Sequence, residues 1–279
     1  MRLIVRPPSE AYRRALSEHP DRNAIDPGRA LLQHRAFVAA LEAVGIEIVA
    51  LPPAADLPDA CFVSDVLITL PRAGEPDGKS ALVVAARPGA PSRRPEVAPV
   101  FARAKELVDL HVAFGSAPHI VEISEPGTLD GGDVIVYGDR VAIGVSARTN
   151  VAGAQQLAQA VRAVGYRAYV CPVSDRLHLA TAVTVIDDER LIGTAAGFAT
   201  LDQASPDVAP LAEIDRILVP DAELPAANVL AVNGVCIIAA GYPHARGELA
   251  DAGENVVEVD LSEFTRADGG PTCLVAFVD

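Results

Sequence analysis

The clearest candidate for chemistry in this sequence is a single thiol close to the end of the chain. Cys273 follows a Gly-Gly-Pro-Thr run at 269–272 and opens the apolar stretch that continues to Val278. Glycines just before a strand allow backbone segments to approach closely, and a thiol in such a place is a candidate nucleophile. The alternative is a small buried residue at the start of a strand, which describes most free cysteines. The local sequence leaves both interpretations open.

Several other side chains could bind a charged ligand or move a proton. His178 lies between two leucines, where a histidine is more often a hydrogen-bonded core residue. Asp130 and Asp133 enclose a Gly-Gly pair, which alone is typical of a turn that opens a strand. Asp59 and Asp65 flank a short apolar run, as turn residues at strand ends do. Taken singly, none of these positions requires a catalytic explanation.

A repeated pattern predicts the elements that would position these residues. Two apolar runs joined by a turn occur at residues 65–88, 133–144, 182–193 and 228–239. Gly138-Asp139, Asp187-Asp188 and Asn233-Gly234 are hairpin turn signals between such runs. The copies begin about 45 to 70 residues apart, a range typical of propellers and arrays. Apolar residues at three- and four-residue spacing predict helices over 30–44, 96–107 and 153–164.

A fifth copy of the pattern is split between the two ends of the chain. The strand predicted at 2–6 has no partner before it, and the strand predicted at 272–278 has none after it. Pairing them would complete a fifth unit and remove two exposed sheet edges. We therefore predict a closed ring of five α/β units in one domain over residues 1–279, in preference to an open α/β sheet. Hairpin ends in such a ring converge on a central channel, a natural place for a small-molecule site.

Composition excludes several classes of protein. Half of the 279 residues are hydrophobic, which is enough for a sizeable core. The net charge of −14 argues against a surface for nucleic acid or anionic membrane, because both need a basic patch. The same charge is compatible with a cationic substrate. We see no N-terminal signal pattern and no apolar stretch that approaches a membrane span.

The four cysteines show no Cys-x-x-Cys spacing, so we expect neither a zinc site nor a disulfide framework. We expect a cytoplasmic protein with reduced thiols, in which Cys61, Cys171 and Cys236 are buried and inert. The histidines other than His178 show no metal-ligand spacing, and no metal is expected.

Six short stretches of the chain form an ordered set of motifs. They are Leu-Pro-Asp-Ala-Cys-Phe-Val-Ser-Asp at 57–65, Arg-Pro-Gly-Ala-Pro-Ser-Arg-Arg at 87–94, Thr-Leu-Asp-Gly-Gly-Asp-Val at 128–134, Ser-Ala-Arg-Thr-Asn at 146–150, Leu-His-Leu at 177–179 and Gly-Gly-Pro-Thr-Cys at 269–273. Together they resemble the dimethylarginine dimethylaminohydrolases, which belong to the pentein (amidinotransferase-like) superfamily. Any one of them would be a weak signal, but six in the right order cover nearly the whole chain. The resemblance implies a five-bladed α/β propeller, which agrees with the split repeat.

The resemblance also implies catalytic roles. Cys273 would be the nucleophile, and its thiolate would be stabilised with help from the substrate's own cation. His178 would protonate the leaving amine and later activate water. Asp130 would orient this histidine through a fixed carboxylate. Asp133 would be structural or lie at the rim of the site.

The substrate-binding residues follow from the same resemblance. Asp59 and Asp65 would contact the guanidinium group, since carboxylates pair with this planar cation through parallel hydrogen bonds. Arg87 and Arg148 would hold the α-carboxylate of the substrate. Surface ion pairs are the expectation for the two arginines at 93 and 94.

Two further features bear on substrate selection. The family usually carries Phe-Val-Glu-Asp where residues 62–65 read Phe-Val-Ser-Asp, so Ser64 would remove one carboxylate from the cation pocket. A charge-assisted contact is worth about 1.5–3 kcal/mol, so substrate affinity or the preferred N-substituent is expected to differ. The segment Pro7 to Ile25 resembles the mobile substrate lid of the family, with a helical part expected between Glu10 and Leu16.

The activity expected from this resemblance is hydrolysis of the guanidino C–N bond of N-methylated arginine, either asymmetric dimethylarginine or monomethylarginine. The products would be citrulline and an alkylamine, formed through a covalent Cys273 thiouronium intermediate without metal or cofactor. Ser64 keeps open an arginine deiminase or another guanidino-compound hydrolase of the superfamily. A catalytically silent binding protein is a further alternative, against which the joint presence of Cys273, His178 and Asp130 argues. The outward helices of a propeller could supply a homodimer interface.

Overall fold

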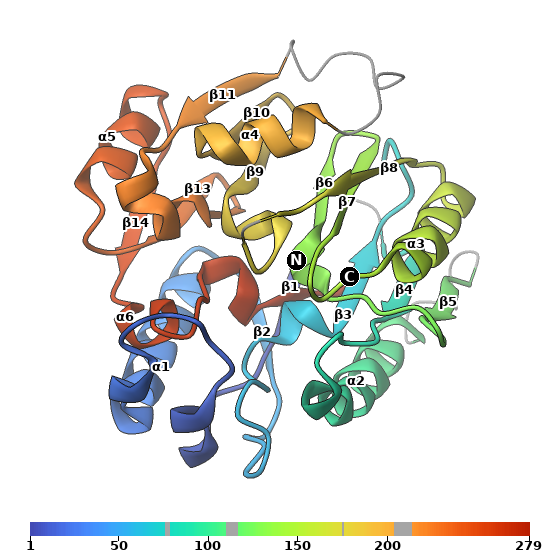
Figure 1. The fold of residues 1–279 in the computed structure, drawn as a ribbon, viewed down its shortest axis with the longest axis horizontal. Helices are drawn as coiled ribbons and strands as arrows, with labels where there is room; N and C mark the ends of the chain where they lie inside the picture. Colours follow the sequence, from blue (N-terminus) through green and yellow to red (C-terminus); the bar gives the residue numbers. More distant parts are fainter. Residues whose placement is uncertain (76–78, 110–116, 175, 204–213) are drawn as a thin grey trace.

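Five three-stranded sheets surround a common centre, and helices cover their outer faces (Figure 1). The computed structural model describes residues 1–75, 79–109, 117–174, 176–203 and 214–279. The strands are β1 (Arg2–Val5), β2 (Glu47–Ala50), β3 (Leu67–Leu70), β4 (Leu82–Ala85), β5 (His119–Glu122), β6 (Val134–Tyr137), β7 (Arg140–Val145), β8 (Arg167–Pro172), β9 (Val183–Asp187), β10 (Arg190–Gly193), β11 (Asp215–Leu218), β12 (Leu230–Val232), β13 (Val235–Ala239), β14 (Val256–Val259) and β15 (Ala276–Phe277). The helices are α1 (Pro27–Ala43), α2 (Val97–Asp109), α3 (Val151–Ala163), α4 (Ala195–Asp202), α5 (Pro243–Asp251) and α6 (Ser262–Thr265).

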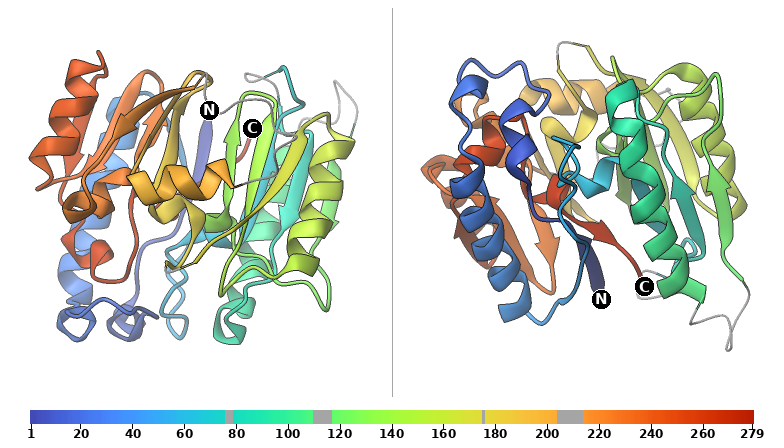
Figure 2. Two further views of the ribbon diagram at one scale, coloured as in Figure 1. Left: turned by 45° about the horizontal axis from the view of Figure 1, so that its top comes forward. Right: turned by 90° about the horizontal axis from the view of Figure 1, so that it is seen from below.

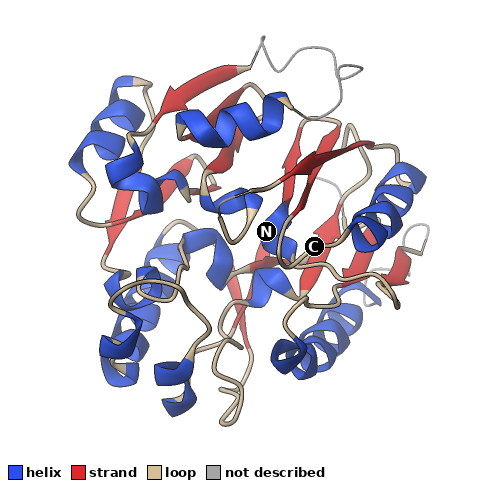
Figure 3. Cartoon of the chain, viewed as in Figure 1, coloured by secondary structure: helices blue, strands red, loops and turns tan. Residues whose placement is uncertain are grey.

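All five sheets have the same construction. An antiparallel pair is followed by a helix and then by a third strand that lies parallel to the second strand of the pair (Figure 3). In one unit, β6 pairs antiparallel with β7, and α3 leads to β8, which pairs parallel with β7. Views from two further directions show helices on the outside of the ring (Figure 2). Parallel strands need such a crossover connection, so the repeat is a ββαβ unit.

The ring closes through the two ends of the chain. Strand β1 pairs antiparallel with β15, with Leu3 opposite Phe277, and parallel with β2. The N- and C-termini lie side by side at the centre of the ring (Figure 1). The predicted split fifth unit and the five-bladed α/β propeller are therefore confirmed. The last strand is shorter than the predicted 272–278, because residues Pro271–Leu274 form a 3₁₀ turn.

Local sequence explains where the elements start. Helix α1 begins three residues before the predicted start, since Asp26 Oδ1 accepts the N–H groups of Gly28 and Arg29 and Pro27 occupies the first turn. Asn150 caps α3 in the same way through the N–H of Gly153. The predicted hairpin turn at Asn233-Gly234 is confirmed, with φ angles of 47° and 74°.

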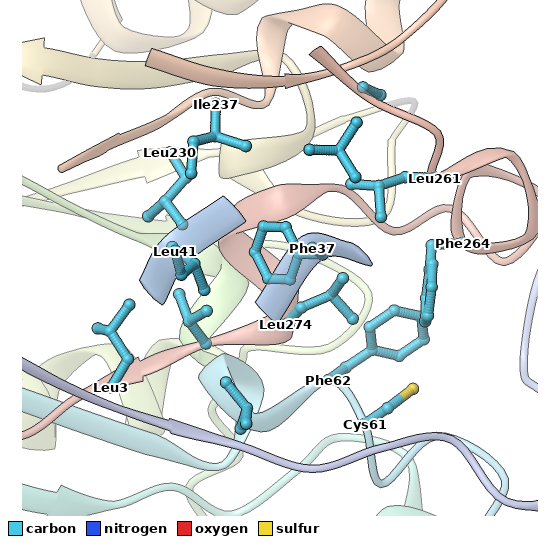
Figure 4. Packing of buried hydrophobic residues seen from close by; sticks show 14 of the residues in the cluster. Leu3, Phe37, Leu41, Cys61, Phe62, Leu230, Ile237, Leu261, Phe264 and Leu274 are labelled. Carbon is cyan, nitrogen blue, oxygen red and sulfur yellow. The ribbon is translucent and has the colours of Figure 1, made fainter. Parts of the chain in front are cut away.

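The core lies between the helices and the sheets. In one cluster, Phe37 and Leu41 of α1 pack against Leu3 of β1 and against Leu230 and Ile237 of the fourth hairpin (Figure 4). The cluster also includes Leu274, and the side chain of Cys273 packs against this cluster. The segment that carries the thiol is therefore anchored in the core.

Burial of the other three thiols agrees with the sequence-based expectation. Cys61, Cys171 and Cys236 are at most 1% exposed, and burial is the main cause that raises their pKa values. Among the described residues, no helix combines the length and the apolar character that a membrane span requires.

A short 3₁₀ turn precedes the first strand of every hairpin and defines one end of the central channel. The turns contact one another across blade boundaries, so side chains from different blades meet there. They span Val63–Asp65 before β3, Gly131–Asp133 before β6, Leu179–Thr181 before β9, Asp221–Ala227 before β12 and Pro271–Leu274 before β15.

Candidate active site

One pocket at this end of the ring collects most of the residues that were expected to do chemistry. Cys273, His178, Asp59, Asp65 and Arg148 all line it. The other lining residues are Leu16, Phe62, Arg93, Leu177, Ala267, Asp268 and Gly269. The carboxylate of Asp65, the imidazole of His178 and the thiol of Cys273 come from three separate blades, and closure of the ring brings them together.

Cys273 lies half-buried in the 3₁₀ turn Pro271–Leu274, and its N–H donates to the carbonyl of Gly270 at 3.1 Å. The two glycines before this turn allow side chains of other blades to pack closely against the backbone. A Cβ at Gly269 would lie 2.4 Å from the ring of Phe62, and one at Gly270 would lie 2.6 Å from the carboxamide of Asn228. The thiol is thus presented by a turn that fits tightly between two neighbouring blades.

His178 and Asp130 form a buried pair. His178 Nε2 lies 3.2 Å from Asp130 Oδ2, and both side chains are less than a tenth exposed. The other oxygen of Asp130 accepts the N–H of Gly89 at 2.9 Å, which fixes the carboxylate. Asp133 does not line the pocket and is fully buried. Its Oδ1 accepts the N–H of Leu179, which holds the turn directly after His178.

The charges in the pocket define its resting state. Burial alone would lower the pKa of His178, but the carboxylates of Asp65, Asp130 and Asp133 outweigh burial and raise it to about 9. The pKa of Asp130 is lowered in spite of burial, by its hydrogen bond with His178. Burial, together with the nearby Asp65, raises the pKa of Cys273 to about 11. At neutral pH the site therefore holds an imidazolium, a carboxylate and a neutral thiol.

This ion pair makes the stability of the fold depend on pH. A histidine whose pKa rises from about 6.5 to about 9 on folding binds an extra proton in the folded state, so its contribution is complete below pH 6.5. We expect the free energy of unfolding to fall by about 1.4 kcal/mol per pH unit from that source as pH rises toward 9. Urea denaturation between pH 6 and 10 measures the slope. His178→Gln should flatten it, and an equal slope in that variant would contradict the assignment.

Arg93 corrects the expectation of a surface ion pair. Its side chain is 5% exposed and lines the pocket, with Nη1 2.6 Å from Asp65 Oδ2 and Nη2 2.9 Å from Glu96 Oε2. The same guanidinium also donates to the carbonyls of Asp59 and Phe62. Burial works to lower the pKa of Arg93, but Asp65 and Glu96 keep it well above its usual value. The guanidinium therefore pairs with the carboxylate of Asp65 in the pocket and with that of Glu96, which does not line it. Arg94 is half-buried and donates to the carbonyl of Pro88.

The structure places two predicted substrate contacts outside the pocket. Arg87 donates to the carbonyl of Gly127 and forms an ion pair with Glu125. Ser64 Oγ donates to the carbonyl of Cys273 at 3.3 Å and faces a second cavity of about 420 Å³ at the other side of the channel. Ser64 therefore contacts the turn that carries the thiol and does not line the pocket.

The segment expected to be a lid covers the pocket. A 3₁₀ turn at Glu10–Arg14 forms most of the predicted helical part. Beyond it, the N–H of Leu16 donates to Asp59 Oδ1, and Ser17 Oγ donates to Asp268 Oδ2 at 2.7 Å. With the segment in this position the pocket has a volume of only about 20 Å³, little more than one water molecule occupies.

Three residues in the pocket or next to it were missed or misplaced by sequence reasoning, and they differ in the signal that they offer. Asp268 has a φ of 57° and lies directly before the Gly-Gly pair, which a turn signal could have suggested. Arg93 offers none, because a basic residue in a polar loop looks like surface. Asn228 has the clearest signal: it opens the fourth hairpin, and the corresponding turns of the other blades carry Asp65, Asp133, His178 or Cys273.

One set of side chains has the spacing of a metal site among the described residues. Ligand atoms of Asp65, Asp130 and His178 lie within 4.8 Å of one another. Asp65 is already paired with Arg93, and Asp130 is paired with a histidine that is protonated at neutral pH. A histidine that ligates a metal must be neutral, so these residues fit an ion-pair network better than a metal site.

Comparisons with known proteins agree with this geometry. A family model described as arginine deiminase matches residues 101–202. The N(G),N(G)-dimethylarginine dimethylaminohydrolase of Streptomyces coelicolor is 37% identical over 98% of this chain and 95% of its own length. The protein of the same name from Pseudomonas aeruginosa is 33% identical over 89% and 88%.

A solved structure gives the same result. A cysteine-to-serine variant of the Pseudomonas aeruginosa enzyme, in complex with citrulline, superposes with a TM-score of 0.82 at 30% identity. The match covers 99% of this chain and 98% of that one. A cyanobacterial arginine dihydrolase domain at 18% identity shares the fold, with a TM-score of 0.76 over 98% of this chain and 96% of that one. The chain belongs to the dimethylarginine dimethylaminohydrolase family.

Proposed function

We propose that this protein hydrolyses the guanidino C–N bond of an N-methylated arginine to give citrulline and an alkylamine. The observation that carries the proposal is the convergence of a thiol, an imidazolium and a pocket carboxylate on one closed pocket, from turns in three blades. Two relatives that match 98% and 89% of this chain carry the name of that activity.

The first half of the reaction breaks the C–N bond. A guanidinium beside Asp65 lowers the pKa of the Cys273 thiol, which gives its proton to solvent, and the thiolate attacks the guanidinium carbon. His178 donates its proton to the leaving nitrogen as the bond to the alkylamine breaks. The product of this half is a positively charged thiouronium on Cys273 and a neutral imidazole, with Asp130 still holding the ring.

The second half uses the neutral His178 as a base. It removes one proton from a water molecule, whose oxygen attacks the same carbon. The C–S bond then breaks, and the departing Cys273 sulfur takes the second proton of the water from the new carbonyl oxygen, which restores the thiol. The ureido group of citrulline results, and His178 returns to its protonated form. The charge of the substrate makes its own carbon electrophilic, so the proposed steps need no cofactor.

The binding residues divide between the two ends of the substrate. Asp65 is the guanidinium contact in this proposal, and Asp59 adds a second carboxylate in the same pocket. Arg148 binds the α-carboxylate. Arg87 would join it only by leaving Glu125, so we assign it a secondary role. The lid segment 7–25 opens to admit substrate, because the closed pocket is too small for an amino acid.

Product analysis tests the proposal. The purified protein would be incubated in parallel with asymmetric dimethylarginine, monomethylarginine and arginine, with Cys273→Ser as the blank, and products would be measured by mass spectrometry. We expect citrulline with dimethylamine or methylamine from the methylated substrates. Citrulline and ammonia from arginine alone would make the protein a deiminase, and no citrulline from any substrate would overturn the proposal.

Two further predictions concern the protein in the cell. The four cysteines are free, which favours the cytoplasmic location predicted from the sequence. A homodimer also stays a prediction, and light scattering of the purified protein would test it.

A further inference from the structure

We propose that Asn228 is a further residue of the catalytic machinery, one that ties the turn after His178 to the turn that carries Cys273 and donates a hydrogen bond toward the sulfur. The proposal rests on Cys273 being the nucleophile. It assigns to the fourth blade, which otherwise contributes nothing to the pocket, a part in the reaction.

The carboxamide of Asn228 bridges two turns that belong to different blades. Its Oδ1 accepts the N–H of Thr272 at 2.9 Å, and its Nδ2 donates to the carbonyl of Ala180 at 3.2 Å. Thr272 immediately precedes the nucleophile, and Ala180 lies two residues after the histidine. The distance between His178 and the thiol of Cys273 is therefore set partly through the side chain of Asn228.

The same amide also reaches the reacting atom. Nδ2 lies 3.9 Å from Cys273 Sγ and 2.8 Å from Thr272 Oγ1. An N–H directed at a sulfur favours the thiolate over the thiol, and the effect is larger in a site that excludes water. Asn228 is 5% exposed and uncharged, so it acts by donating and not by transferring a proton.

The orientation of the carboxamide is determined by its partners. The N–H of Thr272 can only donate and the carbonyl of Ala180 can only accept, so the oxygen must face Thr272 and the nitrogen must face Ala180. Gly270 is part of the arrangement, since a Cβ there would collide with the carboxamide at 2.6 Å. The Gly-Gly-Pro-Thr-Cys run and Asn228 therefore fit each other as one unit.

The test compares Asn228→Asp and Asn228→Ala with Gln33→Ala. Gln33 is a matched control, because it is also 5% exposed and also accepts a backbone N–H and donates to a hydroxyl, but it does so between α1 and α6. The readout is the rate of iodoacetamide alkylation of Cys273 from pH 6 to 11, followed on the Cys273 peptide by mass spectrometry. It needs no substrate, so it is independent of the proposed function.

We expect alkylation at pH 8 to slow by about tenfold in Asn228→Asp, where a donor is replaced by a negative charge and the thiol pKa rises by about one unit. Asn228→Ala should slow the alkylation by about threefold. Gln33→Ala should lose about as much thermal stability as Asn228→Ala but leave the alkylation rate unchanged. With a methylated arginine, kcat should fall more than KM rises. An alkylation profile in both Asn228 variants equal to that of Gln33→Ala would overturn the proposal. Asn228→Asp is isosteric, so it keeps the test available if the alanine variant does not fold.

Discussion

Replacement of Cys273 by serine is expected to lower kcat by at least about 10⁴-fold while leaving the fold intact. The neighbouring histidine is protonated near neutral pH, since its pKa is about 9, so it cannot act as a base for a serine hydroxyl. A guanidinium can lower a thiol pKa of about 11 far enough to release the proton, but a hydroxyl lies several pKa units higher. The substitution therefore abolishes the nucleophile, because the serine hydroxyl stays protonated, and does not merely replace it by a weaker one.

Steady-state citrulline production from methylated arginine measures this effect, and circular dichroism checks the fold. Serine retains the backbone N–H that donates to Gly270, so the turn should be undisturbed. A second observation concerns the intermediate: acid quenching of the wild-type reaction should reveal a mass increase equal to the substrate minus its amine, located on the Cys273 peptide. Activity above about 1% in the serine variant, or an adduct on any other residue, would exclude the proposed nucleophile.

The fold could be predicted because each of its parts leaves a local trace in the sequence. Turn residues such as Asn233-Gly234 mark the hairpins, and the spacing of the apolar runs marks the repeat. The split fifth unit followed from counting strands without partners. The start of the last strand was predicted less accurately, because Pro271 and the tight contact of Gly270 with Asn228 favour a 3₁₀ turn that no period of apolar residues reports.

The site could be predicted only where a motif carries the information. Cys273, His178 and the carboxylate partner of His178, Asp130, lie in short stretches that resemble a known family. Arg93 was misplaced because its burial depends on Asp65 and Glu96, and the partner at 65 lies 28 residues away in the sequence. Ser64 was interpreted as a substrate contact, although its hydroxyl faces the carbonyl of Cys273. Which way a side chain points depends on the tertiary structure, and a single sequence does not contain it.

The second large effect is expected from Arg93→Met, which should lower the free energy of unfolding at pH 7.5 by about 3–5 kcal/mol. Methionine fills a similar volume without the charge, so Asp65 and Glu96 would both lose the guanidinium that pairs with them in a buried place. The matched control is Arg167→Met. Arg167 also forms a close two-point pair, with Asp139, but both side chains are about half exposed, and such a pair contributes about 0–1 kcal/mol. Urea denaturation of the three proteins measures the difference. Equal losses in the two variants would mean that Arg93 is not a buried counter-ion.

The pH dependence of this loss separates the charge of Arg93 from its packing. Burial, against the attraction of Arg93, already raises the pKa of Glu96 to about 7, and removal of the arginine would raise it further. Carboxyl groups with raised folded-state pKa values bind protons more readily in the folded than in the unfolded chain, so their penalty disappears as pH falls. The difference between wild type and Arg93→Met should therefore narrow from pH 8 to pH 5. A difference that stays constant would indicate lost packing alone.

KM for methylated arginine should rise in the same variant, because Asp65 loses the partner that fixes its carboxylate in the pocket.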